Sequence, residues 1–174
     1  ATFVLFAPYT ESLWLLFAFV FAPTLPARSA TYYVGSISAL TSRISSAVAG
    51  DEIVLSNGVY TTSSSISVNK VGTAASPILI RSETVGGAEI TGSNGFSLSG
   101  PAAYVAIQGL KFTHASGLSV NTGTSHCRFT RNIIELNITS TNAVSYINIS
   151  GDDVQIDRNE LRNKSTLGEM LNIT

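Results

Sequence analysis

The stretch CRFTRN, from Cys127 to Asn132, returns one repeat later as VQIDRN, from Val154 to Asn159. Each copy reads apolar, polar, apolar, polar, arginine, asparagine. The alternation predicts a short β-strand with one buried face, because successive side chains point to opposite sides of a strand. A pattern that returns after a near-constant spacing predicts a stacked repeat architecture.

Three apolar lines extend this repeat along the chain from residue 78, with members that recur every 22 to 29 residues. Like residues would then stack on like in successive coils and form a continuous core. The first line is Ile78/Ile80, Val105/Ile107, Cys127/Phe129 and Val154/Ile156; the second is Ile90, Phe112, Ile134 and Leu161; the third is Phe96/Leu98, Leu118/Val120, Ile147/Ile149 and Leu171/Ile173.

Three short strands per repeat predict one coil of an all-β fold, the right-handed parallel β-helix. Each strand would pair with its copy in the next coil, about 4.8 Å away. Asn132 and Asn159 fall at the same turn, where their side-chain amides can hydrogen-bond along the axis. The alternative is a β-sandwich of short antiparallel strands, which would not require such ladders.

The segment from Ser36 to Ala49 predicts a helix ahead of the coils. Ser36 can cap its start and Gly50 can end it. An open β-helix end exposes unpaired strand edges, so we expect this helix to cap the N-terminal end of the stack. Four apolar residues share its predicted buried face: Ile37, Leu40, Ile44 and Val48.

Residues 1–30 read as a signal peptide. The apolar run from Leu13 to Ala22 is followed by two prolines and by small residues that end at Ala30, which is typical of a secretory signal and its cleavage zone. We therefore expect a protein that is secreted, outside the cell or in the periplasm, and not held in the membrane after cleavage. Residues 31–174 would form the N-terminal part of a β-helix domain, truncated at its C-terminal end because the last residues lie in an alternating run.

Composition excludes several function classes. Charged residues make up 12% of the chain and the net charge is -1, so no basic stripe indicates a nucleic-acid partner. The single cysteine, Cys127, has no intrachain disulfide partner and is expected in the core. We expect no catalytic or metal-binding role for His114 or His126.

Several segments together resemble the start of polysaccharide lyase family 6, which includes alginate lyases and chondroitinase B. The resemblance covers essentially all of residues 30–174. It rests on Ala30–Val34, the predicted helix from Ser36, Gly50–Tyr60, Pro77–Arg81, Glu89–Gly92, Tyr104–Phe112, and Asn163-Lys164 followed by Gly168.

This resemblance implies β-elimination on a uronic-acid polymer, either alginate or dermatan/chondroitin sulfate. In the family a lysine removes the proton next to the carboxylate, an arginine assists, and a calcium ion neutralises the carboxylate. The calcium ligands include two glutamates spaced Glu-x-Glu, a pattern that this chain lacks. We therefore expect the catalytic and calcium-binding residues after Thr174, and assign none within the chain.

Three cations remain as candidate contacts to an acidic polysaccharide: Lys164, Arg162 and Arg158. Cationic side chains suit carboxylates and sulfates. Each of them could equally lie in a solvated turn, and Arg158 shares its repeat position with Arg131. Two other functions stay open, because the fold does not fix the site. One is another β-helix carbohydrate enzyme, such as a pectate lyase or a glycoside hydrolase, and the other is a non-catalytic sugar-binding β-helix.

Overall fold

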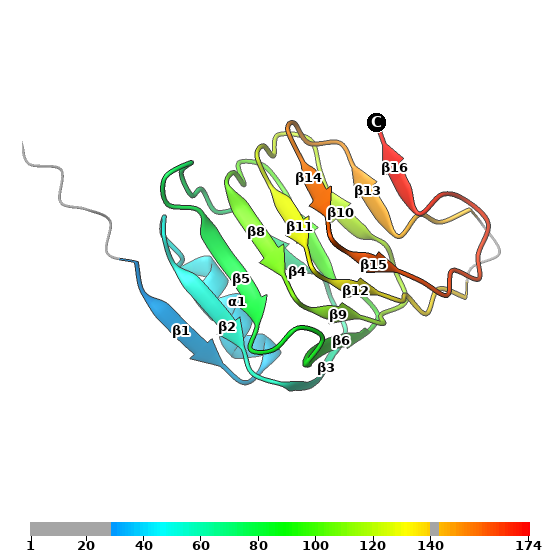
Figure 1. Ribbon diagram of the computed structural model, residues 1–174, viewed down its shortest axis with the longest axis horizontal. Coiled ribbons are helices and arrows are strands. Elements are labelled where there is room, and N and C mark those ends of the chain that lie inside the picture. The colour runs from blue at the N-terminus through cyan, green and yellow to red at the C-terminus, as the bar shows by residue number, and fades with distance from the viewer. Residues whose placement is uncertain (1–28, 140–142) are drawn as a thin grey trace, which may run out of the picture.

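The computed structural model describes residues 29–139 and 143–174. Their strands form three parallel sheets, which we call A, B and C, wound as a β-helix (Figure 1). Sheet A holds β1 (Thr31–Val34), β2 (Glu52–Leu55), β5 (Ile78–Ser82), β8 (Val105–Gln108), β11 (Arg128–Thr130) and β14 (Gln155–Asp157). Sheet B holds β3 (Gly58–Thr62), β6 (Ala88–Gly92), β9 (Lys111–Phe112), β12 (Ile133–Ile134) and β15 (Glu160–Leu161). Sheet C holds β4 (Ile66–Val68), β7 (Phe96–Leu98), β10 (Leu118–Val120), β13 (Ile147–Ile149) and β16 (Leu171–Ile173).

Every described strand pair is parallel, and the chain visits the sheets in the order A, B, C in each coil. The three predicted apolar lines are confirmed as ladders. Phe129 pairs with Ile107 on one side and with Ile156 on the other, and both Ile107 and Phe129 are fully buried. Ile134 pairs with Phe112 in sheet B in the same way. The antiparallel sandwich is thereby excluded.

One coil was missed from the sequence. The predicted stacking began at Ile78, but β2, β3 and β4 already form a coil that pairs with β5, β6 and β7. The hidden strand was β4, which has only three residues and lies between polar segments. Ile66 and Val68 on this strand are buried, so the core extends to the helix.

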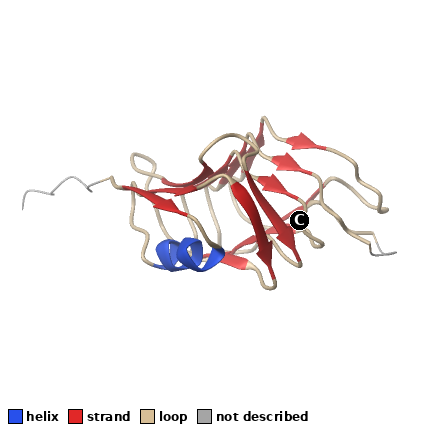
Figure 2. Ribbon diagram, turned by 90° about the horizontal axis from the view of Figure 1, so that it is seen from below, coloured by secondary structure: helices blue, strands red, loops and turns tan. Residues whose placement is uncertain are grey.

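Helix α1 (Ile37–Ser45) covers the N-terminal end of the stack, where it contacts the first strand of each sheet (Figure 2). Ser36 caps it as predicted, since its hydroxyl accepts from the Ala39 amide at 3.1 Å. Leu40 and Ile44 are buried, which confirms the cap.

The predicted C-terminal boundary of this helix was wrong. The helix ends at Ser45, where the Ser46 amide donates to Arg43 O, and not at Gly50. Val48 was expected on the buried face but lies beyond the last turn and is 57% exposed. Gly50 instead adopts a φ of 89° in the turn before β2.

The turn from sheet A to sheet B, which we call the A–B corner, contains the predicted asparagine ladder. Asn132 Oδ1 accepts from the Leu110 amide at 3.0 Å, and Asn132 Nδ2 donates to Ile107 O at 3.0 Å. The same nitrogen lies 3.0 Å from Asn159 Oδ1, which also accepts from the Asn132 amide. The ladder therefore joins three consecutive coils.

The predicted signal peptide lies almost entirely outside the described residues, which begin at Ser29. Cys127, expected in the core, is buried there.

Candidate functional site

Arg158 lies at the A–B corner between β14 and β15. Its φ of 56° is in the left-handed region, like the φ of 55° at Arg131 one coil earlier. Arg158 Nε is 3.6 Å from Asp157 Oδ2, and the side chain is 65% exposed. Of the three predicted cations, it has the longest ion pair and the most accessible charge.

Arg162 follows β15 and is paired with two carboxylates. Its Nε lies 3.3 Å from Glu135 Oε2 in the previous coil, and its Nη1 lies 3.0 Å from Glu160 Oε1. An acidic ligand at this position would compete with both glutamates.

Lys164 lies in the connection from sheet B to sheet C, the B–C corner. Its ammonium group donates to Thr166 O and Thr166 Oγ1, each at 2.8 Å, and to Leu167 O at 2.9 Å. All three ammonium hydrogens thus have partners in the loop. The geometry gives Lys164 a role in holding this loop, over the buried ring of Tyr146 at 5.8 Å.

The three cations do not converge on one groove. A groove of about 360 Å³ opens beside the B–C corner, lined by Lys111, Thr113, Glu135, Leu136, Asn137, Asn163 and Ser165. Neither Arg162 nor Lys164 lines it, and Lys111 is paired with Glu89 at 2.8 Å. Substrate binding by Lys164, Arg162 and Arg158 stays a prediction.

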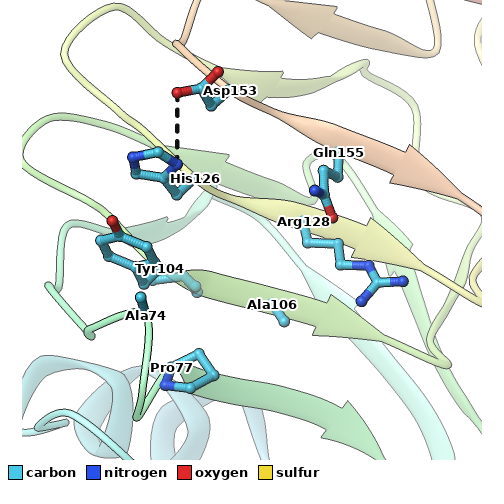
Figure 3. Close-up of a pocket in the computed structure, with 9 residues that line it drawn as sticks. Ala74, Pro77, Tyr104, Ala106, His126, Arg128, Asp153 and Gln155 are labelled. Atoms are coloured by element: carbon cyan, nitrogen blue, oxygen red, sulfur yellow. Dashed lines mark ion pairs between the residues drawn. The ribbon is translucent and has the colours of Figure 1, made fainter.

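A larger groove, of about 600 Å³, crosses four coils on the outer face of sheet A where its strands begin (Figure 3). Two rows of side chains, each with one residue per coil, contribute most of its lining. The first row is Pro77, Tyr104, His126 and Asp153; the second is Ala106, Arg128 and Gln155, and Ala74 and Val105 complete the lining.

The first row is built on strained corner residues. Tyr104, His126 and Asp153 have φ values of 52°, 52° and 50°, a conformation that residues other than glycine rarely adopt. The rings of Tyr104 and His126 stack with centroids 4.5 Å apart and planes 17° apart. His126 Nδ1 lies 3.6 Å from Asp153 Oδ2 on the far side, so the row is a continuous side-chain stack (Figure 3).

The second row contains a strong ion pair. Arg128 Nε and Nη2 donate to the two carboxylate oxygens of Asp157, each at 2.7 Å. This bidentate pair lowers the pKa of Asp157 to about 2 and raises the pKa of Arg128. The guanidinium is thereby fixed in one orientation beside Gln155.

The sequence had not predicted this groove. For His126 the sequence predicted no catalytic or metal-binding role, and Tyr104 and Ala106 entered only as part of the family resemblance. The usable signal was their common offset: Tyr104, His126 and Asp153 each stand two residues before a member of the second row.

The family described as Chondroitinase B matches residues 34–174. Among solved structures, the chain is similar to a polysaccharide lyase family 6 alginate lyase, AlyGC, with 23% identity and a TM-score of 0.74. That match covers 83% of this chain and 21% of the lyase, so this chain spans about a fifth of its length.

A second similar structure is a mannuronic acid specific polysaccharide family 6 lyase from human gut microbiota, with 18% identity and a TM-score of 0.66, covering 84% of this chain and 36% of that one. A third is a family 6 polysaccharide lyase from Pseudopedobacter saltans, with 18% identity and a TM-score of 0.55, covering 82% and 41%. The comparison with curated proteins found no match. The structural likeness shows the fold, a right-handed parallel β-helix. Because the family match extends over most of the sequence, the chain belongs to the chondroitinase B family.

Proposed function

We propose that this chain is the N-terminal part of a secreted polysaccharide lyase that cleaves a uronic-acid polymer by β-elimination. The family match over residues 34–174 carries this proposal. It favours a lyase over the glycoside hydrolase and the non-catalytic sugar-binding protein that the fold alone leaves open. Alginate and dermatan or chondroitin sulfate are the candidate substrates.

The reaction sets requirements that point beyond the described coils. A carbon-bound proton next to a carboxylate becomes removable when a cation neutralises that carboxylate and a base lies within hydrogen-bond reach. Within residues 29–139 and 143–174, no group of three or more His, Cys, Asp or Glu side chains could hold a metal ion. We propose, as the family resemblance implies, that calcium and the base belong to the remainder of the complete protein.

The described coils would then act as a scaffold. Ile156, Leu161 and Leu171 in the last described coil are only partly buried, whereas their counterparts Phe129, Ile134 and Ile147 in the preceding coil are fully buried. A further coil stacked on β14, β15 and β16 would complete their burial. Of the predicted cations, Arg158 is the best placed to meet an acidic polymer, because its charge is the most accessible.

Secretion is part of the proposal and rests on the apolar run at residues 13–22 and the small residues after it. Across the described ranges, no helix has the length and apolar character to cross a bilayer.

The test compares the complete protein with this chain by ultraviolet absorbance of the unsaturated product, in the presence of calcium. We expect the complete protein to produce the signal on alginate or on dermatan sulfate, and residues 31–174 to produce none. Activity from residues 31–174 that is lost in Lys164→Ala would place the catalytic site in this part of the chain and contradict the assignment. A complete protein inactive on every uronic-acid polymer would reject the lyase proposal.

A further inference from the structure

The groove on sheet A has the composition of a sugar-binding site. One part of its lining is apolar and is formed by Ala74, Pro77, Ala106 and the ring of Tyr104, and the other part carries His126, Arg128, Asp153 and Gln155. A pyranose ring has the matching division, with C–H groups on its faces and hydroxyl groups at its rim. The volume of about 600 Å³ lies within the range of small-molecule sites.

The hollow exists because Ala106 is small. Ala106 pairs with Leu79 on one side and with Arg128 on the other, so two long side chains flank a methyl group on the outer face of sheet A. Figure 3 shows Ala106 between Pro77 and Arg128 on the floor of the groove.

The aromatic wall is held in place before any ligand arrives. Tyr104 is stacked on His126, and both residues are fixed at the corner by backbone hydrogen bonds from Tyr104 N to Ser125 O and from His126 N to Asp152 O. A fixed ring loses little conformational entropy when it binds a ligand. Strained backbone at these corners is stable only where the surroundings determine it.

Arg128 lines the groove with a guanidinium that can bind the carboxylate of an acidic ligand. Asp157 occupies Nε and one hydrogen of Nη2, and a guanidinium has five N–H donors in total, so donors remain for a ligand. Asp153, the carboxylate that lines the groove, faces His126 across 3.6 Å. Gln155 adds an uncharged donor and acceptor next to Arg128.

We propose that this groove binds a uronate residue of an acidic polysaccharide, with the sugar ring against Tyr104 and the carboxylate on Arg128. The substrate class rests on the proposed function; the groove itself rests on the geometry of sheet A. It would hold the polymer on the outer face of coils that carry no metal cluster among their described residues.

The experiment measures binding of an alginate hexasaccharide to the full chain by isothermal titration calorimetry, with cellohexaose as the uncharged ligand. Ala106→Glu fills the groove without removing a native contact, and Tyr104→Ala removes the wall. We expect each variant to weaken binding of the acidic ligand by about tenfold or more. Tyr104→Phe keeps the ring and should bind within about twofold of the wild type.

Val59→Glu is the matched control, because it adds the same charge at a 70% exposed strand position in sheet B. It should leave the affinity unchanged, and circular dichroism verifies that each variant is folded. Wild-type affinity that persists in folded Ala106→Glu and Tyr104→Ala overturns the proposal, as does absence of wild-type binding or equal affinity for cellohexaose. These outcomes are separate from failure of the lyase proposal, which shows as a complete protein that releases no unsaturated product.

Discussion

Two corners of the β-helix bury polar side chains, with opposite results. At the A–B corner, Asn132 is 1% exposed, and its side-chain oxygen and nitrogen are hydrogen-bonded to neighbouring coils. At the B–C corner, His114 is 0% exposed, and neither ring nitrogen has a hydrogen-bond partner among the described residues. Burial lowers the pKa of His114 to about 4, against a weaker opposing effect of the Ser116 backbone.

The two side chains differ in hydrogen bonding because different residues lie one coil away from them. Asn159 lies one coil above Asn132 and offers an amide that can both donate and accept. The pairing register of sheet B continues past the end of β9. There His114 lies between Gly92 in the coil below and Leu136 in the coil above, and neither residue offers a polar side-chain atom. The ring fits because Gly95 leaves room: a Cβ there would lie 2.0 Å from His114 Nε2. The buried amide of Asn132 is therefore satisfied by the coils on both sides of it, whereas the buried imidazole of His114 has no hydrogen-bond partner among the described residues.

Of the substitutions that test this comparison, Asn132→Ala should cause the largest loss of stability. The change leaves the Leu110 amide and Ile107 O without their side-chain partner, and each buried unpaired group costs roughly 1–3 kcal/mol. Asn159 Oδ1 loses one of its two hydrogen bonds and keeps the one from the Asn132 backbone amide. We expect a loss of about 4 kcal/mol in the free energy of unfolding, measured by urea denaturation.

Asn121→Ala is the control for the ladder, because Asn121 also bonds to the coil below it but is exposed. It should cost less than about 1.5 kcal/mol. Equal losses in the two variants would show that burial does not set the value of a ladder amide.

His114 should make stability depend on pH. Its pKa is about 4 in the folded protein against an ordinary value of 6.5 for histidine, so protonation favours the unfolded state. The contribution of the neutral His114 ring to the free energy of unfolding is fully present above pH 6.5 and declines as pH falls toward 4. Between about pH 7.5 and about pH 5 we expect a loss of about 2 kcal/mol in unfolding free energy.

His114→Leu tests this directly, since the neighbouring coil has Leu136 at the same position. The variant should lack that decline and be more stable than the wild type at about pH 5. The same exchange at His126, whose side chain is 42% exposed, should keep the decline. If the slope survives in His114→Leu, another group causes it.

The sequence predicts what the repeat encodes. The ladders through Phe129, Ile134 and Ile147 and the pair Asn132/Asn159 are visible because each residue type returns at the coil spacing. The predicted helix end was wrong because the apolar spacing continues in the sequence as far as Val48, whereas the backbone leaves the helix at Ser46.

Features made from unlike residues in different coils were not predicted. The burial of His114 requires Gly95, and the groove requires a small Ala106 beside Tyr104 and Arg128. Neither set repeats one residue type at the coil spacing, so only the common offset of Tyr104, His126 and Asp153 before the second row could have indicated the groove. Of the candidate cations, Lys164 could be named from sequence, but its three loop contacts depend on how residues 164–167 fold back.

Glu89 provides a partly exposed counterpart of the asparagine ladder, with a side chain that is 25% exposed, and the smallest expected effect. It accepts from Lys111 Nζ at 2.8 Å and from Thr113 Oγ1 at 2.7 Å on the outer face of sheet B, and these bonds lower its pKa. Because water competes for both partners, Glu89→Gln should cost less than about 1 kcal/mol, and less still at high salt. The lowered pKa means that the contribution of Glu89 is present above the ordinary value of 4.5 and is lost as pH falls below it, which lies below the interval from about pH 7.5 to about pH 5 that tests His114. A double-mutant cycle with Lys111→Met measures the coupling energy between Glu89 and Lys111. A coupling as large as the loss in Asn132→Ala would contradict the view that burial makes the asparagine contacts stronger than those of Glu89.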